Sequence, residues 1–503
     1  ARRPGRLRCA LDPTRPEYLL SDGLRSADLR ALLAERLTLA DEAAPAASRT
    51  YYDTFDGRLR AAGLELVHAD GRLAAVDAAG REVAGIELAR APDAVRAADL
   101  PELADALDVR AATRIARVRV RRRALRVLDG ERKTVVRMAL EDPGEPLSPR
   151  LLVRAVRGYD KALRQVRGVL EDDLGLVTAT RPLADDAVAA TGGVPGGVSS
   201  KLDVALDGRA RADTAAVIVA TRLLETIEAN VPGTLADIDP EFLHDLRVAV
   251  RRTRALQREL KRVFPPAELA ALRDEFRWLQ QITGPTRDLD VHLLELEEAT
   301  DPGLAPLQEL LAVERRRAQR RMARALRSDR TREALDGWRA LLAGLGERPD
   351  ADRPDAGTRV AKVAAKRIRA VYRQMVAMGE AIGDDTPAEA LHDLRKKGKE
   401  LRYLLEFFAS LFPESEVTPM VKTLKALQDT LGRFQDHEVQ AAALRALGKR
   451  VIDHDEGAGA LMAMGVVVAR LEAGQVAARA EFAERFAPFA SSARRKAVEA
   501  TFR

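Results

Sequence analysis

The chain contains the pentapeptide Leu243-His244-Asp245-Leu246-Arg247 twice, because the same five residues return at 391–395, 148 residues later. The alignment continues at this spacing without a gap, so that Arg277 matches Lys425, Gly284 matches Gly432 and Asp288 matches Asp436. A match across about forty-five positions is too long for a chance motif and indicates an internal duplication. The repeated feature is a histidine followed by cations.

These cations share one face of each predicted helix. With 100° per residue, His244 and Arg247, Arg251, Arg254 and Arg258 fall within an arc of about 80°. Like charges three or four residues apart repel by about 0.2–0.5 kcal/mol per pair, so each face needs compensation. Either acidic side chains of a neighbouring helix or an external polyanion can supply it. The second copy has the same face, formed by His392, Arg395, Lys399 and Arg402.

Two further basic faces strengthen the case for an external polyanion. No acidic residue is interleaved on either arc, and several such faces in one helical domain would be hard to neutralise internally. Guanidinium groups bind phosphate bidentately and ammonium groups bind it as point charges. The two faces consist of Arg317, Arg320, Arg321, Arg324 and Arg327, and of Lys362, Lys366, Arg369 and Arg373.

The histidines and aspartates of the repeat allow other roles. His244 and His392 are either phosphate donors or core histidines that bind a backbone carbonyl. Asp288 and Asp436 follow the Gly284 and Gly432 breaks by four residues, where we expect them to cap a helix or orient an arginine. A metal site built with His292 and His437 is disfavoured, because no HExxH-type spacing occurs and the surrounding cations repel a metal ion.

Length and composition favour an intracellular, multidomain and mostly helical protein, and the mixed patterns of residues 1–190 make the fold class multidomain α+β. The 503 residues are 46% hydrophobic but only 4% aromatic, which is typical of helices held by aliphatic side chains. The lone Cys9 excludes an internal disulfide framework, and no stretch resembles a membrane span or signal core. We therefore expect a cytoplasmic protein with no membrane partner; its oligomeric state stays open.

Changes in residue pattern and a glycine-rich segment divide the chain into three parts. Residues 1–190 show mixed α and β patterns, the Gly-rich segment 191–202 is typical of a linker, and 203–503 is helical. Within the helical part, Asp239-Pro240 starts one helix, and Thr386-Pro387-Ala388-Glu389 starts its repeat with a capping box. The halves at about 203–345 and 358–503 each have room for about four long helices. The sequence predicts two four-helix bundles related by a pseudo-twofold axis.

A long strand is expected in the first domain. Val118 and Val120 alternate with arginines, so a strand would have one apolar and one basic face. Asp129-Gly130 predicts a hairpin turn before the next strand, at 134–136. The basic face is a possible second anion site, formed by Arg117, Arg119, Arg121 and Arg123.

The duplicated helices and the Leu-Gln-x-x-x-Gly-x-x-x-Asp elements resemble the CHAD domain, the conserved histidine α-helical domain, across roughly 203–503. The resemblance implies a basic groove that binds inorganic polyphosphate, often at polyphosphate granules, without a cofactor. Motif position and the basic faces together give the following expected contacts: His244, Arg247, Arg251, Arg254, Arg277, Arg317, Arg320, Arg324, Lys366, Arg369, His392, Arg395, Lys396, Lys399, Arg402 and Lys425.

The N-terminal part is similar to CYTH domains, which form an antiparallel β tunnel and include triphosphatases and adenylyl cyclases. The similarity lies in residues 51–66 and 149–159. The family's opening Glu-x-Glu-x-Lys is missing, since Arg6-Leu7-Arg8-Cys9-Ala10-Leu11 stands near that place, and Val67-His68-Ala69-Asp70 replaces a basic strand end. Such glutamates hold the Mg²⁺ that aligns a triphosphate, so we expect Mg²⁺ only if this domain is active.

Three functions follow. The leading one is a polyphosphate-binding protein without catalysis, in which the N-terminal domain assists or acts as a scaffold. The alternative is a metal-dependent triphosphatase or polyphosphatase that uses the N-terminal tunnel. A nucleic-acid binder is disfavoured, because aromatic residues that would stack on bases are sparse and no docking motif is present.

Overall fold

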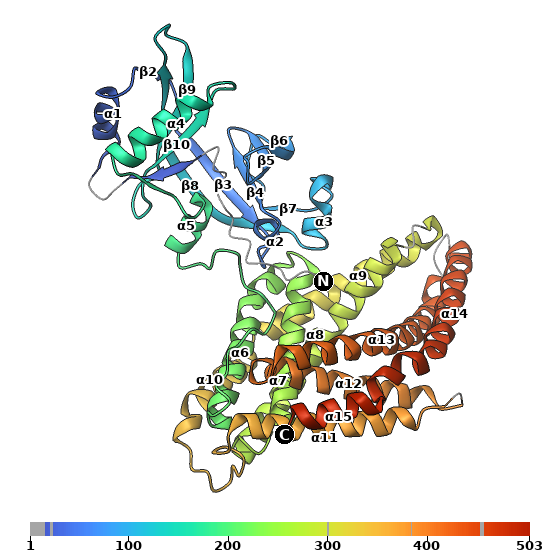
Figure 1. The fold of residues 1–503 in the computed structure, drawn as a ribbon. Helices are drawn as coiled ribbons and strands as arrows, with labels where there is room; N and C mark the ends of the chain where they lie inside the picture. Colours follow the sequence, from blue (N-terminus) through green and yellow to red (C-terminus); the bar gives the residue numbers. More distant parts are fainter. Residues whose placement is uncertain (1–15, 21–23, 299–300, 384, 453–456) are drawn as a thin grey trace. The chain divides into compact units, whose positions relative to one another are not determined.

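The computed structural model describes residues 16–20, 24–298, 301–383, 385–452 and 457–503, and it divides into two units, Ala1–Ser199 and Ser200–Arg503 (Figure 1). The residues at 6–11 that stand near the expected opening strand lie outside the described part. The N-terminal unit is an antiparallel sheet with short helices, and the second unit is all helical. This confirms the predicted fold class.

The part of the N-terminal unit that the structure describes forms a sheet of eleven strands in the order β11-β1-β10-β9-β8-β3-β4-β5-β6, with β2 and β7 also paired to β8. No pairing among the described residues joins β11 to β6. The strands are β1 (Glu17–Leu19), β2 (Leu39–Glu42), β3 (Ala47–Asp53), β4 (Leu64–Ala69), β5 (Arg72–Asp77), β6 (Glu82–Glu87), β7 (Ala94–Val95), β8 (Ala112–Leu128), β9 (Thr134–Asp142), β10 (Arg150–Ala155) and β11 (Val177–Thr178).

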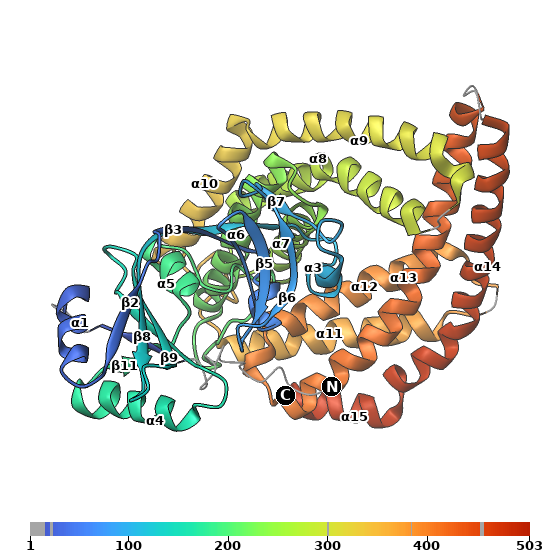
Figure 2. The same ribbon diagram turned by 90° about the horizontal axis from the view of Figure 1, so that it is seen from above.

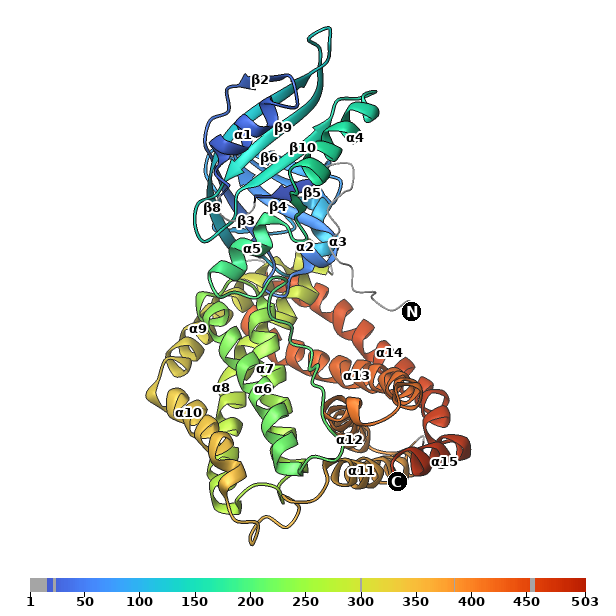
Figure 3. The same ribbon diagram turned by 60° about the vertical axis from the view of Figure 1, so that its left-hand side comes forward.

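Helices complete two hydrophobic clusters against this sheet. Apolar side chains of α1 and α4 pack with those of β8, β9 and β10. Figure 3 shows the ribbon of α4 beside β10. Leu183 and Ala187 of α5 pack with Tyr51, Val118 and Val120. The helices are α1 (Ser26–Ala34), α2 (Arg58–Ala61), α3 (Ala104–Leu107), α4 (Asp160–Gly168) and α5 (Leu183–Ala190).

Strand β8 has the two faces that the sequence predicts. Val118 and Val120 are buried, whereas Arg117, Arg119, Arg121 and Arg123 are exposed. The turn to β9 is closed by the Asp129 carboxylate, which accepts hydrogen bonds from two backbone N–H groups.

The glycine-rich segment packs onto the N-terminal unit instead of hanging free as a linker. The amide of Val198 donates a hydrogen bond to the carbonyl of Phe55. Gly57 and Gly196 approach so closely that a Cβ on Gly57 would lie 2.2 Å from the Gly196 oxygen. Glycine at these positions is therefore a packing requirement, which composition alone could not distinguish from flexibility.

Within its described residues, the helical unit has two sets of five α-helices, the four longer ones of each set being followed by a shorter fifth. Figure 2 shows the two sets from above. The first set is α6 (Ala212–Ala236), α7 (Pro240–Glu259), α8 (Pro266–Glu298), α9 (Ala305–Leu326) and α10 (Asp329–Gly344). The second set is α11 (Val360–Glu380), α12 (Ala388–Phe407), α13 (Glu414–Val451), α14 (Gly457–Ala490) and α15 (Ser492–Thr501). Helices α6, α7 and α8 begin 148 residues before α11, α12 and α13.

Contacts between equivalent positions reveal the pseudo-twofold relation. Arg211 and Arg359, which are 148 residues apart, pair with each other as an isolated antiparallel bridge. On either side of it, Ala212 N donates to Thr358 O and Val360 N donates to Ala210 O, both at 2.9 Å. A contact between a residue and its own repeat equivalent places the axis between them.

Of the two expected helix starts, the structure confirms the cap at Asp239 and contradicts the capping box at Thr386. Asp239 caps α7, because its carboxylate accepts from the amides of Glu241 and Phe242 at 2.9 and 3.3 Å. Thr386 does not cap α12; its hydroxyl accepts from the amide of Gly383 instead. Proline at 387 already sets an extended backbone at the N-cap, so the capping-box prediction was wrong.

One helix of the described residues, α14, is long and apolar enough to cross a membrane when length and composition alone are considered. Its Ala, Val and Met residues give a window with hydropathy 1.4, so the expectation of no such stretch does not hold. Phe482, Phe486 and Phe489 near its end pack into the core of the helical unit.

Candidate functional site: the central basic cluster

The two basic faces of α7 and α12 meet near the axis that relates the repeats. Arg252 of α7 pairs with Glu406 of α12 at 2.8 Å, and Arg258 pairs with Glu400 at 3.4 Å. These ion pairs are equivalent under the 148-residue shift, which maps 252 to 400 and 258 to 406. They hold the two helices together by their flanks, and the cations between them form the central basic cluster: Arg247, Arg251, Arg254, Arg395, Lys399 and Arg402.

The centre of the cluster is uncompensated. Arg251 and its repeat equivalent Lys399 make no ion pair or hydrogen bond with any described residue, and the Arg251 Nε is buried without a partner. Burial lowers the pKa of Lys399 to about 8, helped by the neighbouring positive charges of Arg395 and Arg251. The two repeats therefore place like charges close together in a partly desolvated position, which costs free energy in the absence of an anion.

The Leu-Gln-x-x-x-Gly-x-x-x-Asp elements position these cations. The side chain of Gln280 accepts a hydrogen bond from Arg254, and that of Gln428 accepts one from Arg402, the equivalent arginine. The backbone carbonyl of Gln280 and the hydroxyl of Thr283 accept from Arg247 at 3.0 and 3.1 Å. These acceptors are neutral and leave the charges of Arg247 and Arg254 uncancelled, whereas Arg402 also pairs with Glu406 of its own helix at 3.3 Å.

Both motif glycines give room to an arginine. A Cβ on Gly284 would lie 3.4 Å from the Arg247 Nη1, and one on Gly432 would lie 3.9 Å from the Arg395 Nη2. The expected helix breaks at these glycines were wrong, since α8 and α13 run through them. Both distances are ordinary van der Waals contacts, so the two arginine side chains pack directly against these glycines.

The two copies differ in their aspartates. Asp436 accepts a hydrogen bond from Arg395 at 2.9 Å, which confirms that it orients an arginine. Its equivalent Asp288 makes no hydrogen bond or ion pair within the described part of the chain, although its charge favours ionised Arg247. Neither aspartate caps a helix, because both lie inside one. Burial lowers the pKa of Arg247, which is the less compensated of the two arginines.

The remaining predicted contacts fall into several groups. Arg277 lies close enough to Arg254 to lower the pKa of Arg254. The positive charge of Arg277 is itself paired with Asp274 at 2.8 Å. Lys396 pairs with Asp393 at 3.0 Å, and Lys425 is exposed. His392 contacts the side chain of Gln435, not a backbone carbonyl, while His244 is half-buried on the matching face.

No hydrogen bond or ion pair among the residues that the structure describes joins the other two basic faces to the cluster. Arg317, Arg320 and Arg324 are exposed on α9. On α11, Lys366 is exposed, but Arg369 and Arg373 both pair with Glu499 of α15. This compensating acid could not be predicted from helical spacing, because Glu499 lies 126 residues after Arg373.

Sequence reasoning missed two cations of the site. Arg273 and Arg287 of α8 lie near Arg254 and Arg247 and help to lower their pKa values. Only the packing of α8 on α7 reveals them, because neither belongs to the repeated motif.

The second anion site and the alternative, metal-dependent site were both expected in the N-terminal unit. The exposed face from Arg117 to Arg123 does not line the large cavity of this unit. No group of three or more His, Cys, Asp or Glu side chains in the described residues is arranged to hold a metal ion.

Comparison with known proteins identifies the helical unit. The sequence profile of the CHAD domain matches residues 218–445. The uncharacterized proteins MT2285 and Rv2226 of Mycobacterium tuberculosis, strains CDC 1551 / Oshkosh and ATCC 25618 / H37Rv, are each 32% identical over 210 residues, which is 40% of this chain. The aligned region spans 39% of those relatives' length.

Two solved structures are similar to the chain. The crystal structure of the CHAD domain from the plant Ricinus communis aligns with 28% identity and a TM-score of 0.47, covering 60% of this chain and 96% of that one. PptA from Streptomyces chartreusis aligns with 17% identity and a TM-score of 0.44, covering 55% and 99%. The chain contains a CHAD domain at residues 218–445, a family associated with polyphosphate binding or metabolism.

Proposed function

We propose that the helical unit binds inorganic polyphosphate along the central basic cluster, without catalysing its breakdown, and that it does so at polyphosphate granules in the cytoplasm. The observation that carries the proposal is the pair Arg251 and Lys399, two equivalent cations from opposite repeats with no acidic partner among the described residues. A linear polyanion supplies closely spaced negative charges to both repeats at once. Monovalent ions satisfy the same charges only weakly.

The shape of the ligand follows from the arrangement of charges. Arg247 and Arg395 are equivalent residues in the two repeats, with the pair Arg251 and Lys399 one helical turn further along each helix. A long chain can contact both repeats simultaneously, whereas orthophosphate reaches one or two cations and loses the gain from linkage. Affinity is therefore expected to rise with chain length, from orthophosphate through tripolyphosphate to long-chain polyphosphate.

The test is a titration of the full chain with these three ligands. The double variant Arg247→Glu and Arg395→Glu should lose retention of long-chain polyphosphate while its helix content, measured by circular dichroism, stays unchanged. The matched control is Arg209→Glu with Arg485→Glu, which reverses two exposed arginines of the same unit that make no ion pair among the described residues. Equal loss in both variants, or retained binding in the first, would refute this assignment.

A further inference from the structure

The N-terminal unit contains a cavity of about 550 Å³, enclosed by β3, β4, β9, β10, α5 and the segment 194–198. This volume is in the range of small-molecule sites. Five arginines and six carboxylates line it, together with apolar side chains such as Val67, Leu152 and Val188. The cavity therefore has no excess of positive charge, in contrast to the central basic cluster.

Its inward arginines are held by the protein's own acids. Arg49 donates to both oxygens of Glu141, at 2.7 and 2.5 Å, and Glu141 is buried. Arg60 forms a bidentate pair with Asp185, and the buried Arg150 pairs with Glu17 at 2.8 Å. A phosphate chain would have to displace these carboxylates, and a group already paired in this way has little remaining attraction for an anion.

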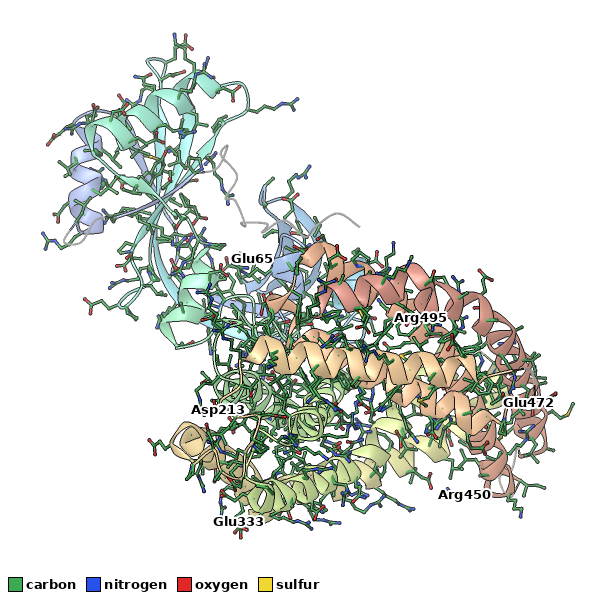
Figure 4. All side chains as sticks on the ribbon, turned by 60° about the horizontal axis from the view of Figure 1, so that its bottom comes forward. Glu65, Asp213, Glu333, Arg450, Glu472 and Arg495 are labelled. Carbon is green, nitrogen blue, oxygen red and sulfur yellow. The ribbon has the colours of Figure 1, made fainter. Side chains whose placement is uncertain are left out.

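One carboxylate of the cavity lining has no partner among the described residues. Glu65 of β4, labelled in Figure 4, makes no hydrogen bond or ion pair with a described residue. Burial, with the nearby charge of Glu17, raises the pKa of Glu65 to about 7, even though Arg49 and Arg150 oppose the shift. An enclosed carboxylate beside a water-accessible space lacks a counter-ion of its own, and a cation entering the space would supply one.

We propose that this cavity binds a small organic ammonium ion, with Glu65 as its counter-ion and the apolar side chains around its hydrocarbon part. The ammonium group would donate hydrogen bonds to the Glu65 carboxylate, with Glu17 adding to the negative potential. The arginine–carboxylate pairs serve as fixed walls that exclude anions. This inference is independent of polyphosphate binding, which we have proposed for the helical unit.

Butylamine is the probe, titrated calorimetrically into the full chain at pH 8, with butan-1-ol as the uncharged analogue and tripolyphosphate as the anion. We expect butylamine to bind at one site per chain and butan-1-ol to give no saturable signal. Glu65→Gln should weaken butylamine at least tenfold, because the shape remains while the charge is lost. Glu65→Asp should restore part of the affinity, and Glu102→Gln, an exposed glutamate of the same unit, should leave it unchanged.

Binding of butylamine to the wild type should also weaken as the pH is lowered from 8 to 6, because Glu65 takes up a proton in that window. This readout needs no variant. The charged and titratable groups that surround Glu65 are Glu17 of β1, Arg49 and Tyr51 of β3, Glu141 of β9, Arg150 of β10 and Asp185 of α5.

Equal butylamine affinity in the wild type and Glu65→Gln, or no saturable binding of butylamine at all, would overturn the inference. A tripolyphosphate affinity that rises in Glu65→Gln but not in Glu102→Gln would also overturn it, because it would make the cavity an anion site. Long-chain polyphosphate should bind all these variants as it binds the wild type. Failure of the ammonium site is thereby distinguished from failure of the central basic cluster.

Discussion

Replacing Lys399 by Met should stabilise the free protein and weaken its binding of polyphosphate. The pKa of Lys399 falls from its ordinary 10.5 to about 8, and with ~1.36 kcal/mol for each unit the folded protein incurs about 3 kcal/mol for charging this side chain. Methionine keeps most of the stem and removes the charge. We expect the free energy of unfolding to rise by about 1–3 kcal/mol at pH 7, with part of the gain offset by changed packing.

The same substitution removes a charge-assisted contact to phosphate. Such contacts contribute about 1.5–3 kcal/mol, so affinity for long-chain polyphosphate should fall by roughly ten- to a hundredfold. A substitution that raises the free energy of unfolding and lowers the affinity for polyphosphate is expected only where the replaced cation is uncompensated in the free protein. Lys496→Met, which removes an exposed lysine of α15, is the matched control and should change neither quantity appreciably.

The pH dependence gives an independent check with a definite sign. Because the pKa of Lys399 is lower in the folded than in the unfolded chain, the unfolded chain binds more protons between pH 8 and 10.5, and stability from this group rises with pH there. Below pH 8 the penalty is complete. Binding has the reverse trend, since polyphosphate favours the charged amine and should bind less tightly as the pH rises through about 8.

The groups that face Lys399 are Arg251 of α7, Arg395 and Arg402 of α12, and Asp436 of α13. Chemical denaturation and calorimetric titration between pH 7 and 9.5 at constant ionic strength measure both trends. The reasoning is refuted by a Lys399→Met protein that unfolds more easily and binds as tightly as the wild type, or by a wild-type affinity that shows no decrease across this range.

Three further outcomes are expected. Asp436→Asn should release Arg395 and tighten polyphosphate binding by about 0.2–1 kcal/mol, an effect that titration of Asp288→Asn should not reproduce. The logarithm of the affinity should fall linearly with the logarithm of KCl concentration, and Arg247→Gln should reduce the slope by about one; an unchanged slope would remove Arg247 from the contacts. Glu141→Gln leaves the partly buried Arg49 and Arg122 without their shared carboxylate and should lower the stability of the N-terminal unit by about 3–5 kcal/mol; a melting curve identical to the wild type's would contradict this.

The sequence predicted those features that repetition makes visible. The two helical halves, their relation by a 148-residue shift and the cations of α7 and α12 could all be predicted, because the motif occurs twice and helical spacing fixes which residues share a face. The roles of Gln280 and Gly284 were less accessible. Both residues stand in the repeat, but only the packing of α8 against α7 shows that one holds an arginine and the other gives an arginine room.

The resemblance to CYTH domains predicted a β tunnel in the N-terminal unit, but the charge pairs that line the cavity could not be predicted, because their residues come from elements far apart in the chain. Arg49 and Glu141 are separated by 92 residues, and Arg60 and Asp185 by 125. Their pairing depends on strand register and on the placement of α5, neither of which appears as a local pattern. The arginines that did form a local pattern, on β8, are exposed and lie outside the cavity.

The duplication explains why the central charges remain uncompensated. In a pseudo-symmetric pair of helices, residues near the axis face their own equivalents, so a cation near the axis in one repeat brings a second cation close to it. Acids can pair with cations away from the axis, as Glu406 and Glu400 do, but Arg251 and Lys399 face each other. A ligand that is negative along its length can compensate the charges of Arg251 and Lys399 together.

On this argument, Arg251→Glu should remove polyphosphate binding, because the new glutamate forms an internal ion pair with Lys399. The pKa of Lys399 should then return to near its ordinary value. Titration of the Arg251→Glu protein followed by NMR of the lysine side chains would measure that pKa, and a value still near 8 would show that burial, not the repeat-related charge, controls it.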